Sequence, residues 1–177
     1  MNYTNLLVEL LVIGICSMLW LIPIGQQILN KDMIHVIAIN DFQTIIALPA
    51  LLYFMGMIMN FISDFIFGFM DEYFAKEFGG KKNIQEIRTI IFVKYEKAVD
   101  YLQQRRSIVR IYRANTLNFL VTTVILFLNV GNVISWFTCS HGYLITINFL
   151  IIVICFSAYV NSLKGYFMFI SKLGKMQ

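Results

Sequence analysis

The stretch that decides the fold is TIIALPALLYFMGMIMNFISDFIFGFM, residues 44–70, in which Asp64 is the single charged residue. It exceeds the roughly 20 apolar residues that an α-helix needs to cross the hydrocarbon core of a bilayer. Three further apolar runs flank it, at Leu6–Ile24, Leu117–Thr138 and Tyr143–Leu163. A content of 59% hydrophobic residues in 177, with a mean hydropathy of +0.72, excludes an ordinary soluble globular protein. We therefore expect an all-α, four-span transmembrane helix bundle that forms one membrane domain over residues 1–177.

The basic residues lie mostly on one side of these runs. Ten of the 14 Lys and Arg residues fall between the second and third runs, three follow the fourth, and one, Lys31, lies between the first and second. Cytoplasmic loops of membrane proteins carry the excess of Lys and Arg. The pattern predicts that both termini, the central segment 71–115 and the basic C-terminal tail 164–177 are cytoplasmic.

The central segment is expected to form a cytoplasmic helical hairpin between spans 2 and 3, over about residues 71–115. The second helix meets no stop before Gly79–Gly80, so it should project about two turns beyond the membrane. Asn83, with Glu86 three residues later, is expected to cap the next helix. No Pro or Gly follows until span 3, so this helix either breaks near Gln103–Ser107 or runs unbroken into that span.

Polar side chains recur on one helical face in three of the four runs. Polar groups in hydrocarbon are costly, so they mark either the bundle interior or a hydrated path. The candidate positions are Asn60 and Asp64 in the second run, Asn118, Thr122, Asn129 and Asn132 in the third, and Asn161 in the fourth. We interpret them as hydrogen-bonding positions between helices. The alternative is that they line a pore in an oligomer.

Three charged residues share a depth near the cytoplasmic interface: Glu9 early in span 1, Asp64 late in span 2 and Lys164 after span 4. An ion pair between Lys164 and either carboxylate would offset the burial of both charges. We expect such a structural pair, and the alternative is a proton-linked or gating role.

Six basic residues of the cytoplasmic segment are candidates for docking to lipid or to a partner: Lys81, Lys82, Arg105, Arg106, Arg110 and Arg113. The last three stand at helical spacing where the chain re-enters the membrane. Contacts with lipid phosphates there would fix the depth of the chain, so membrane lipid is one expected partner. The alternative is a docking site for a cytoplasmic protein or an anionic ligand.

Aromatic side chains on the cytoplasmic segment are expected to protrude, which favours a cytoplasmic effector protein as partner. They are Phe74, Phe78, Phe92, Tyr95 and Tyr101. No direct nucleic-acid contact is expected, because six acidic residues accompany the ten basic ones in this segment.

Catalysis and metal binding have no support in the sequence. The P-loop, H-E-x-x-H and G-x-S-x-G signatures are absent, so we expect no enzyme, no cofactor and no catalytic residue. The two histidines, His35 and His141, fall in different predicted outer loops and are too few to predict a metal site.

The four runs and the segment Asp71–Arg113 together resemble the membrane subunit of the Kiwa bacterial anti-phage system. The resemblance is architectural and covers the whole chain. It implies a homo-tetramer in the bacterial inner membrane that senses phage attack and pairs with a soluble, DNA-binding effector. The multi-span plan is also similar to the accessory membrane protein of type VI-B CRISPR loci, which would imply modulation of an RNA-guided nuclease.

Three functions compete at this point. The first is a non-catalytic membrane sensor or anchor that oligomerises and holds an effector through its hairpin. The second is an oligomeric ion-conducting pore lined by the polar stripe of span 3. The third is a small transporter, which ranks last because no broken helix or inverted repeat marks a substrate site.

Overall fold

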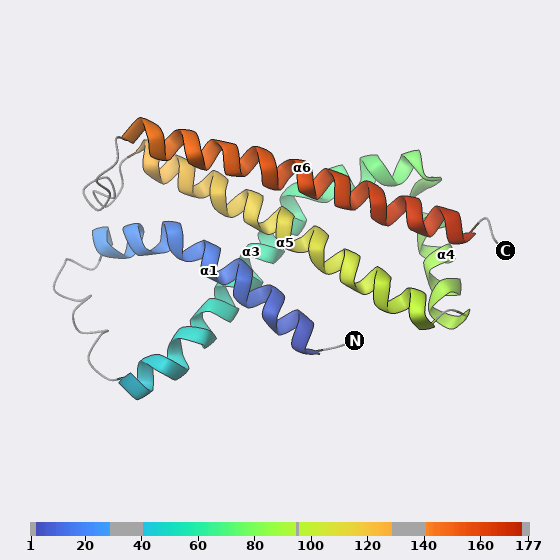
Figure 1. Cartoon of the computed structure of the whole chain (residues 1–177), viewed down its shortest axis with the longest axis horizontal. Helices are drawn as coiled ribbons and strands as arrows, with labels where there is room; N and C mark the ends of the chain where they lie inside the picture. Colours follow the sequence, from blue (N-terminus) through green and yellow to red (C-terminus); the bar gives the residue numbers. More distant parts are fainter. Residues whose placement is uncertain (1–2, 29–40, 95, 129–140, 175–177) are drawn as a thin grey trace.

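The computed structural model describes residues 3–28, 41–94, 96–128 and 141–174, and within these ranges the chain is helical with no strand. Five helices are present in these ranges: α1 (Tyr3–Ile28), α3 (Asp41–Glu77), α4 (Gly80–Lys94), α5 (Glu96–Phe127) and α6 (His141–Gly174) (Figure 1). The all-α class expected from the sequence is confirmed for the described part of the chain.

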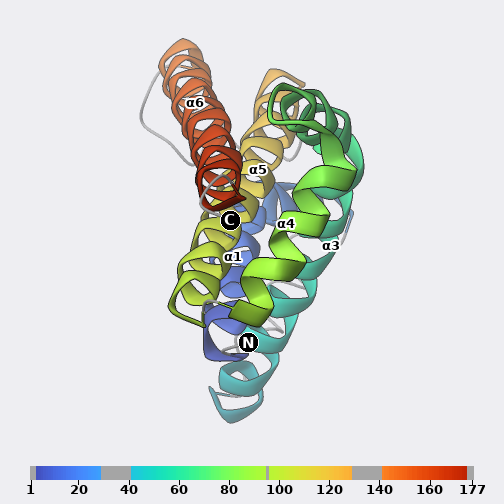
Figure 2. The same ribbon diagram turned by 90° about the vertical axis from the view of Figure 1, so that its right-hand side faces the viewer.

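Helix α5 is the centre of the arrangement and packs against each of the other described helices. Helix α6 runs alongside it, and α1 lies between α5 and the oblique α3 (Figures 1 and 2). The short helix α4 lies at one end of the molecule, where it contacts α3, α5 and α6. The C-terminus lies at the same end, opposite the end at which α5 stops and α6 begins.

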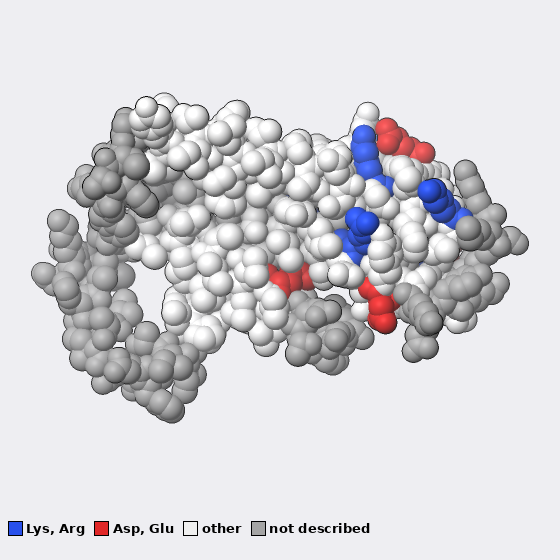
Figure 3. All heavy atoms as spheres, in the orientation of Figure 1, with Lys and Arg blue, Asp and Glu red and all other residues white. Residues whose placement is uncertain are grey.

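Three of the described helices are long and apolar enough to cross a membrane: Leu6–Gly25, Ala47–Glu77 and Gly142–Gly174. The expected span at Leu117–Thr138 continues past Leu128 into residues outside the described ranges, so the fourth crossing stays a prediction. Charge separates along the molecule: on the face in Figure 3, Lys, Arg, Asp and Glu gather towards the end that carries α4, and the described left-hand part shows none.

Gly14 of α1 and Gly56 of α3 allow the two helices to cross with their backbones in contact. A Cβ atom on Gly14 would overlap the carbonyl oxygen of Leu52, and one on Gly56 would overlap the carbonyl oxygen of Leu10. The two backbones therefore touch directly at these points. Small residues permit such close approach in membrane helices, where packing rather than hydrophobic exclusion drives association.

The helix α3 projects past the second apolar run and ends at Glu77, close to the stop predicted at Gly79–Gly80. Both glycines adopt positive φ, of 98° and 88°, a conformation that costs glycine least. The predicted cap at Asn83 is wrong, because α4 begins at Gly80 and Asn83 lies inside its first turn. The positive φ of both glycines reverses the chain at residues 79–80, so the helix begins three residues before Asn83.

Helix α5 is unbroken from Glu96 to Phe127, so the alternative break near Gln103–Ser107 does not occur. The other alternative, one unbroken helix from Asn83 into span 3, is wrong as well, because α4 ends at Lys94 and α5 begins at Glu96. At 1.5 Å per residue, its 32 residues span roughly 48 Å. The single helix α5 therefore contains both the charged segment and the start of the expected third span.

The end of α6 covers the aromatic face that was expected to protrude. Phe74 is buried, and Phe78 packs on Phe167 with ring centroids 6.1 Å apart. Helix α6 continues to Gly174 and buries Phe167 and Ile170 against this face, so the expectation of protruding rings is wrong for Phe74 and Phe78. Of the others, Phe92 and Tyr101 are exposed, and Tyr95 lies outside the described residues.

Candidate functional site

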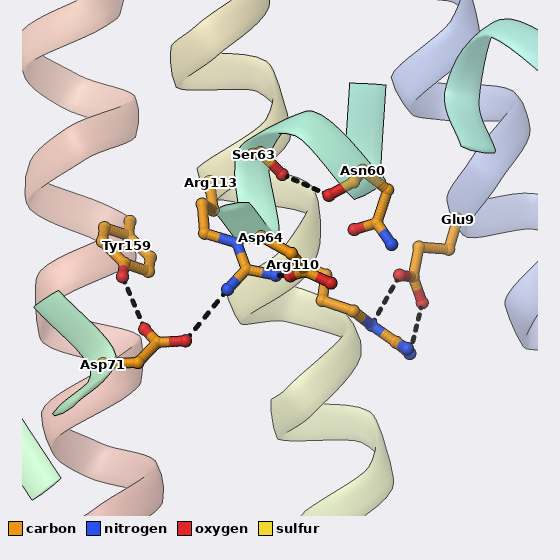
Figure 4. A network of polar contacts seen from close by, with 8 residues as sticks. All are labelled: Glu9, Asn60, Ser63, Asp64, Asp71, Arg110, Arg113 and Tyr159. Carbon is orange, nitrogen blue, oxygen red and sulfur yellow. Dashed lines mark hydrogen bonds and ion pairs between the residues drawn. The ribbon is translucent and has the colours of Figure 1, made fainter. Parts of the chain in front are cut away.

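The buried guanidinium of Arg113, on α5, is the centre of a polar network between three helices. Its Nη2 forms an ion pair with Asp64 of α3, and its Nη1 donates to Oδ2 of Asp71 at 3.0 Å (Figure 4). The other oxygen of Asp71 accepts a hydrogen bond from the hydroxyl of Tyr159 at 2.6 Å. Arg113 is 4% exposed and Tyr159 is fully buried. The network therefore ties α3, α5 and α6 together.

A second ion pair ties α1 to α5 one turn away. The Nε of Arg110 lies 2.8 Å from Oε1 of Glu9, and its Nη2 donates to Oε2 at 3.0 Å. The pairing thus combines one charge-assisted hydrogen bond with a second close ionic contact. Glu9 is 1% exposed, so this pairing is what makes the burial of its charge tolerable.

Together the two ion-pair groups join all four long helices with three carboxylates and two guanidinium groups. Asn60 lies between them in Figure 4, and its buried Oδ1 has no hydrogen-bond partner among the described residues. Removing one partner from a buried ion pair leaves an uncompensated charge and costs about 3–5 kcal/mol. The network therefore fixes the relative positions of the long helices at this depth.

The charge cluster predicted from depth is present, but its partners differ from the expected ones. Glu9 pairs with Arg110 and Asp64 pairs with Arg113, instead of either pairing with Lys164. The ammonium of Lys164 lies over the ring of Phe74, 5.2 Å from its centroid. Position along a helix gives depth but not direction around the bundle, and the central α5 presents its arginines to both carboxylates.

The six candidate docking residues separate into different environments. Arg110 and Arg113 face inward in these ion pairs, rather than outward to lipid or a partner as expected. The Nε of Arg105 donates to the hydroxyl of Tyr101 at 2.8 Å. Arg106 is exposed and lines two clefts, Lys82 is exposed, and the side chain of Lys81 lies outside the described residues.

Of the polar positions predicted inside the spans, Asn118 is the most deeply enclosed. Its Oδ1 accepts hydrogen bonds from Trp20 Nε1 at 3.0 Å and Ser17 Oγ at 3.1 Å, and its Nδ2 donates to the carbonyl of Ile13 at 3.0 Å. The amide thus joins α1 to α5 and does not face a channel within this protomer. Thr122 donates to the carbonyl of Asn118 on its own helix.

Among the remaining polar positions of spans 3 and 4, only Asn161 lies in the described part of the chain. Asn161 is exposed on α6, and Asn129 and Asn132 lie outside the described residues. A pore lining built on the span 3 stripe would therefore depend on residues beyond the described part of α5.

Sequence reasoning missed Asp71 and Tyr159 in the network. Asp71 follows Asp64 by seven residues, which places both carboxylates on one face of α3, and Arg110 and Arg113 stand three apart on α5. The available signal for Asp71 was the second carboxylate on the same face of α3 as Asp64. No sequence signal marked Tyr159, because tyrosines are common in apolar helices.

Two clefts adjoin the network at the charged end of the molecule. One, of about 560 Å³, lies between α3, α4, α5 and α6, and the other, of about 1050 Å³, lies between α1, α4 and α5 with Tyr166 of α6 at its wall. Arg88, Arg106 and Arg110 line both. No group of three or more His, Cys, Asp or Glu side chains in the described ranges is placed to hold a metal ion.

These features define a helical protein with three candidate membrane-crossing helices, a charged end and an ion-pair network that joins the two parts. No protein-family model, no curated protein and no solved structure matches the chain.

Proposed function

We propose that this protein is a non-catalytic sensor or anchor subunit of the bacterial inner membrane. It crosses the membrane four times with both termini in the cytoplasm, oligomerises, and holds a cytoplasmic effector through the α4–α5 hairpin. The observation that carries this proposal is the continuity of α5, a single helix that joins the charged segment to the apolar one.

The continuous helix α5 connects the membrane-spanning part of the protein to the part outside the membrane. At roughly 48 Å, α5 exceeds the ~30 Å hydrocarbon core, so part of it must lie outside the membrane. The ion pairs of Arg110 and Arg113 fix this rod to α1 and α3 near the boundary. A displacement of the spans is therefore passed to the segment before Arg110 and to the α4 helix that packs on it.

The surface offered to the effector is the exposed end of α4. Phe92 is 41% exposed and Val93 is 82% exposed, although α4 lies outside the candidate membrane spans. The guanidinium of Arg88 lies over the ring of Phe92, 5.4 Å from its centroid. Aromatic and arginine side chains supply much of the binding energy at protein interfaces. This combination supports protein docking at α4.

The biological setting proposed is anti-phage defence. The architecture resembles the Kiwa membrane subunit, which pairs with a soluble DNA-binding effector, so contact with nucleic acid is assigned to the effector and not to this chain. By the same resemblance the oligomer is a tetramer. The accessory protein of type VI-B CRISPR loci is the rival, and it would provide an RNA-guided nuclease as the effector.

Co-purification with the products of neighbouring genes tests the docking surface. Tagged full-length protein is expected to retain a soluble neighbour, and Val93→Glu is expected to release it while the oligomer stays intact, because an unpaired charge would enter an apolar contact. Lys172→Glu, an exposed change near the end of α6, is the control and should keep the neighbour. Retention of the neighbour by Val93→Glu would contradict docking at α4.

A further inference from the structure

The larger cleft, between α1, α4 and α5, combines a basic wall with an apolar one. Arg88 of α4 and Arg106 of α5 contribute the basic wall. Leu6 and Val8 of α1, with Ile111 of α5, contribute the apolar wall. Figure 2 shows the first turns of α1 near the junction of α4 and α5, where this cleft lies.

Two of the three arginines that line this cleft, Arg88 and Arg106, have no carboxylate within ion-pair distance among the described residues. Of the two acidic side chains in the cleft lining, Glu9 is paired with Arg110, and Asp100 is exposed to solvent. Arg88 and Arg106 therefore leave an excess of positive charge at the cleft. Like charges held on one cleft raise its affinity for an anion placed between them.

The environment of Arg106 agrees with this geometry. Although the side chain reaches the surface, the surrounding protein withdraws part of its guanidinium from water, which lowers its pKa, and the positive charge of Arg88 lowers it further. An arginine still keeps its proton at neutral pH. The charges of Tyr166 and Glu9 act in the opposite direction, and the pKa of Arg106 still lies below its ordinary value.

The apolar wall belongs to a helix that is able to cross a membrane. Val8 is 57% exposed and lies within the candidate span Leu6–Gly25. A soluble anion would leave this wall exposed to water. An amphipathic anion would cover both walls.

We propose that this cleft binds an anionic phospholipid, with its phosphate between Arg88 and Arg106 and an acyl chain against Val8 and Ile111. The planar guanidinium group matches phosphate geometry through two parallel hydrogen bonds. The inference rests on the cytoplasmic orientation of α4 in the proposed function. It adds that the lipid bridges the span α1 to the hairpin that holds the effector.

Native mass spectrometry of the detergent-solubilised full chain tests this assignment. Phosphatidylglycerol is titrated against phosphatidylcholine, and inorganic phosphate provides the soluble arm. Wild type is expected to bind phosphatidylglycerol in preference to the other two. The double variant Arg88→Gln/Arg106→Gln should weaken that binding at least about tenfold, because charge-assisted contacts to the phosphate are lost.

Lys82→Gln/Arg105→Gln is the matched control, since it also removes one positive charge from α4 and one from α5, at residues that do not line the cleft. It should bind phosphatidylglycerol as wild type does. Equal binding by wild type and the double variant would overturn the proposal. Displacement of the lipid by inorganic phosphate at equal concentration would also overturn it, because the apolar wall would then contribute nothing.

Cross-linking on the wild-type protein gives an answer that does not depend on any variant. Phosphatidylglycerol with a photoreactive acyl chain should label peptides that contain Val8 or Ile111. Labelling confined to the exposed face of α6 would place the lipid elsewhere and overturn the assignment. Arg88 also belongs to the effector surface on α4, so Arg106→Gln alone separates this inference from the proposed function. It should weaken lipid binding and keep the effector, whereas Val93→Glu, which does not line the cleft, should lose the effector and keep the lipid. Loss of effector without loss of lipid in Arg106→Gln would overturn the lipid assignment.

Discussion

Arg110 on α5 and Glu9 on α1 form a two-contact ion pair between residues 101 positions apart in the sequence. The pair closes the bundle at the depth where the apolar half of α5 gives way to its charged half. Glu9 is almost completely buried, so Arg110 compensates a charge that would otherwise be very costly in an apolar helix.

Glu9→Gln is expected to destabilise the protein by about 3–5 kcal/mol, because it leaves the guanidinium of Arg110 without its counter-charge. Thermal unfolding in detergent measures the effect. The double change Glu9→Leu/Arg110→Leu should cost less than the sum of the two single changes, since the charges are removed together. Glu86→Gln on the exposed face of α4 is the control and should stay within about 0.5 kcal/mol of wild type. Additive losses at Glu9 and Arg110 would show that the two groups are not coupled.

Tyr159→Phe is expected to cost about 1.5–3 kcal/mol, the range for hydrogen bonds to charged groups, because the hydroxyl donates to the carboxylate of Asp71. The same unfolding assay applies. Tyr143→Phe removes a hydroxyl from an exposed tyrosine on the same helix and should have little effect. Equal effects of the two changes would argue against the Tyr159–Asp71 bond.

Gly56→Ala is expected to separate α1 from α3, since the added methyl group would overlap the carbonyl oxygen of Leu10. Overpacking of this kind costs about 1–3 kcal/mol. Gly68→Ala is the control on the same helix, where nothing lies within 4 Å of the added atom. It should be neutral or stabilising by up to about 1 kcal/mol, because alanine favours a helix over glycine. The close crossing is refuted if Gly56→Ala is as stable as Gly68→Ala.

Asn118→Leu should destabilise the bundle by about 2 kcal/mol, because the part-buried indole N–H of Trp20 loses its acceptor and the carbonyl of Ile13 loses the Asn118 donor. The hydroxyl of Ser17 keeps the carbonyl of Ile13 as an acceptor. Asn161→Leu changes an exposed amide on α6 and should have a small effect. Ion flux in proteoliposomes, measured on both variants, addresses the pore alternative. Flux that Asn118→Leu alters without loss of stability would favour a pore lining over an interhelical contact.

Features that depend on a single helix, such as its length and its ends, could be predicted from the sequence. Apolar length marked the three candidate spans, and the glycine pair at residues 79–80 marked the end of α3. The absence of Pro and Gly after Asn83 correctly indicated helical structure, although the start of α4 was placed three residues late. Local patterns of length and stop residues determine these features.

The pairings were harder to predict because they depend on rotation around the bundle. The depth of Lys164 suggested a pair with Asp64 or Glu9, but α5 lies between the other helices and brings Arg110 and Arg113 to those carboxylates. In the same way, the end of α6 covers Phe74, which no local pattern in α3 could reveal. Which faces meet is decided by tertiary packing.

We propose above that this chain oligomerises in the membrane and holds a soluble effector. The measurement that tests it most directly is the mass of the intact complex, after purification of the tagged chain co-expressed with its chromosomal neighbours. We expect an oligomer, a tetramer by resemblance, that carries a soluble neighbour. A monomer that carries no other protein would contradict it.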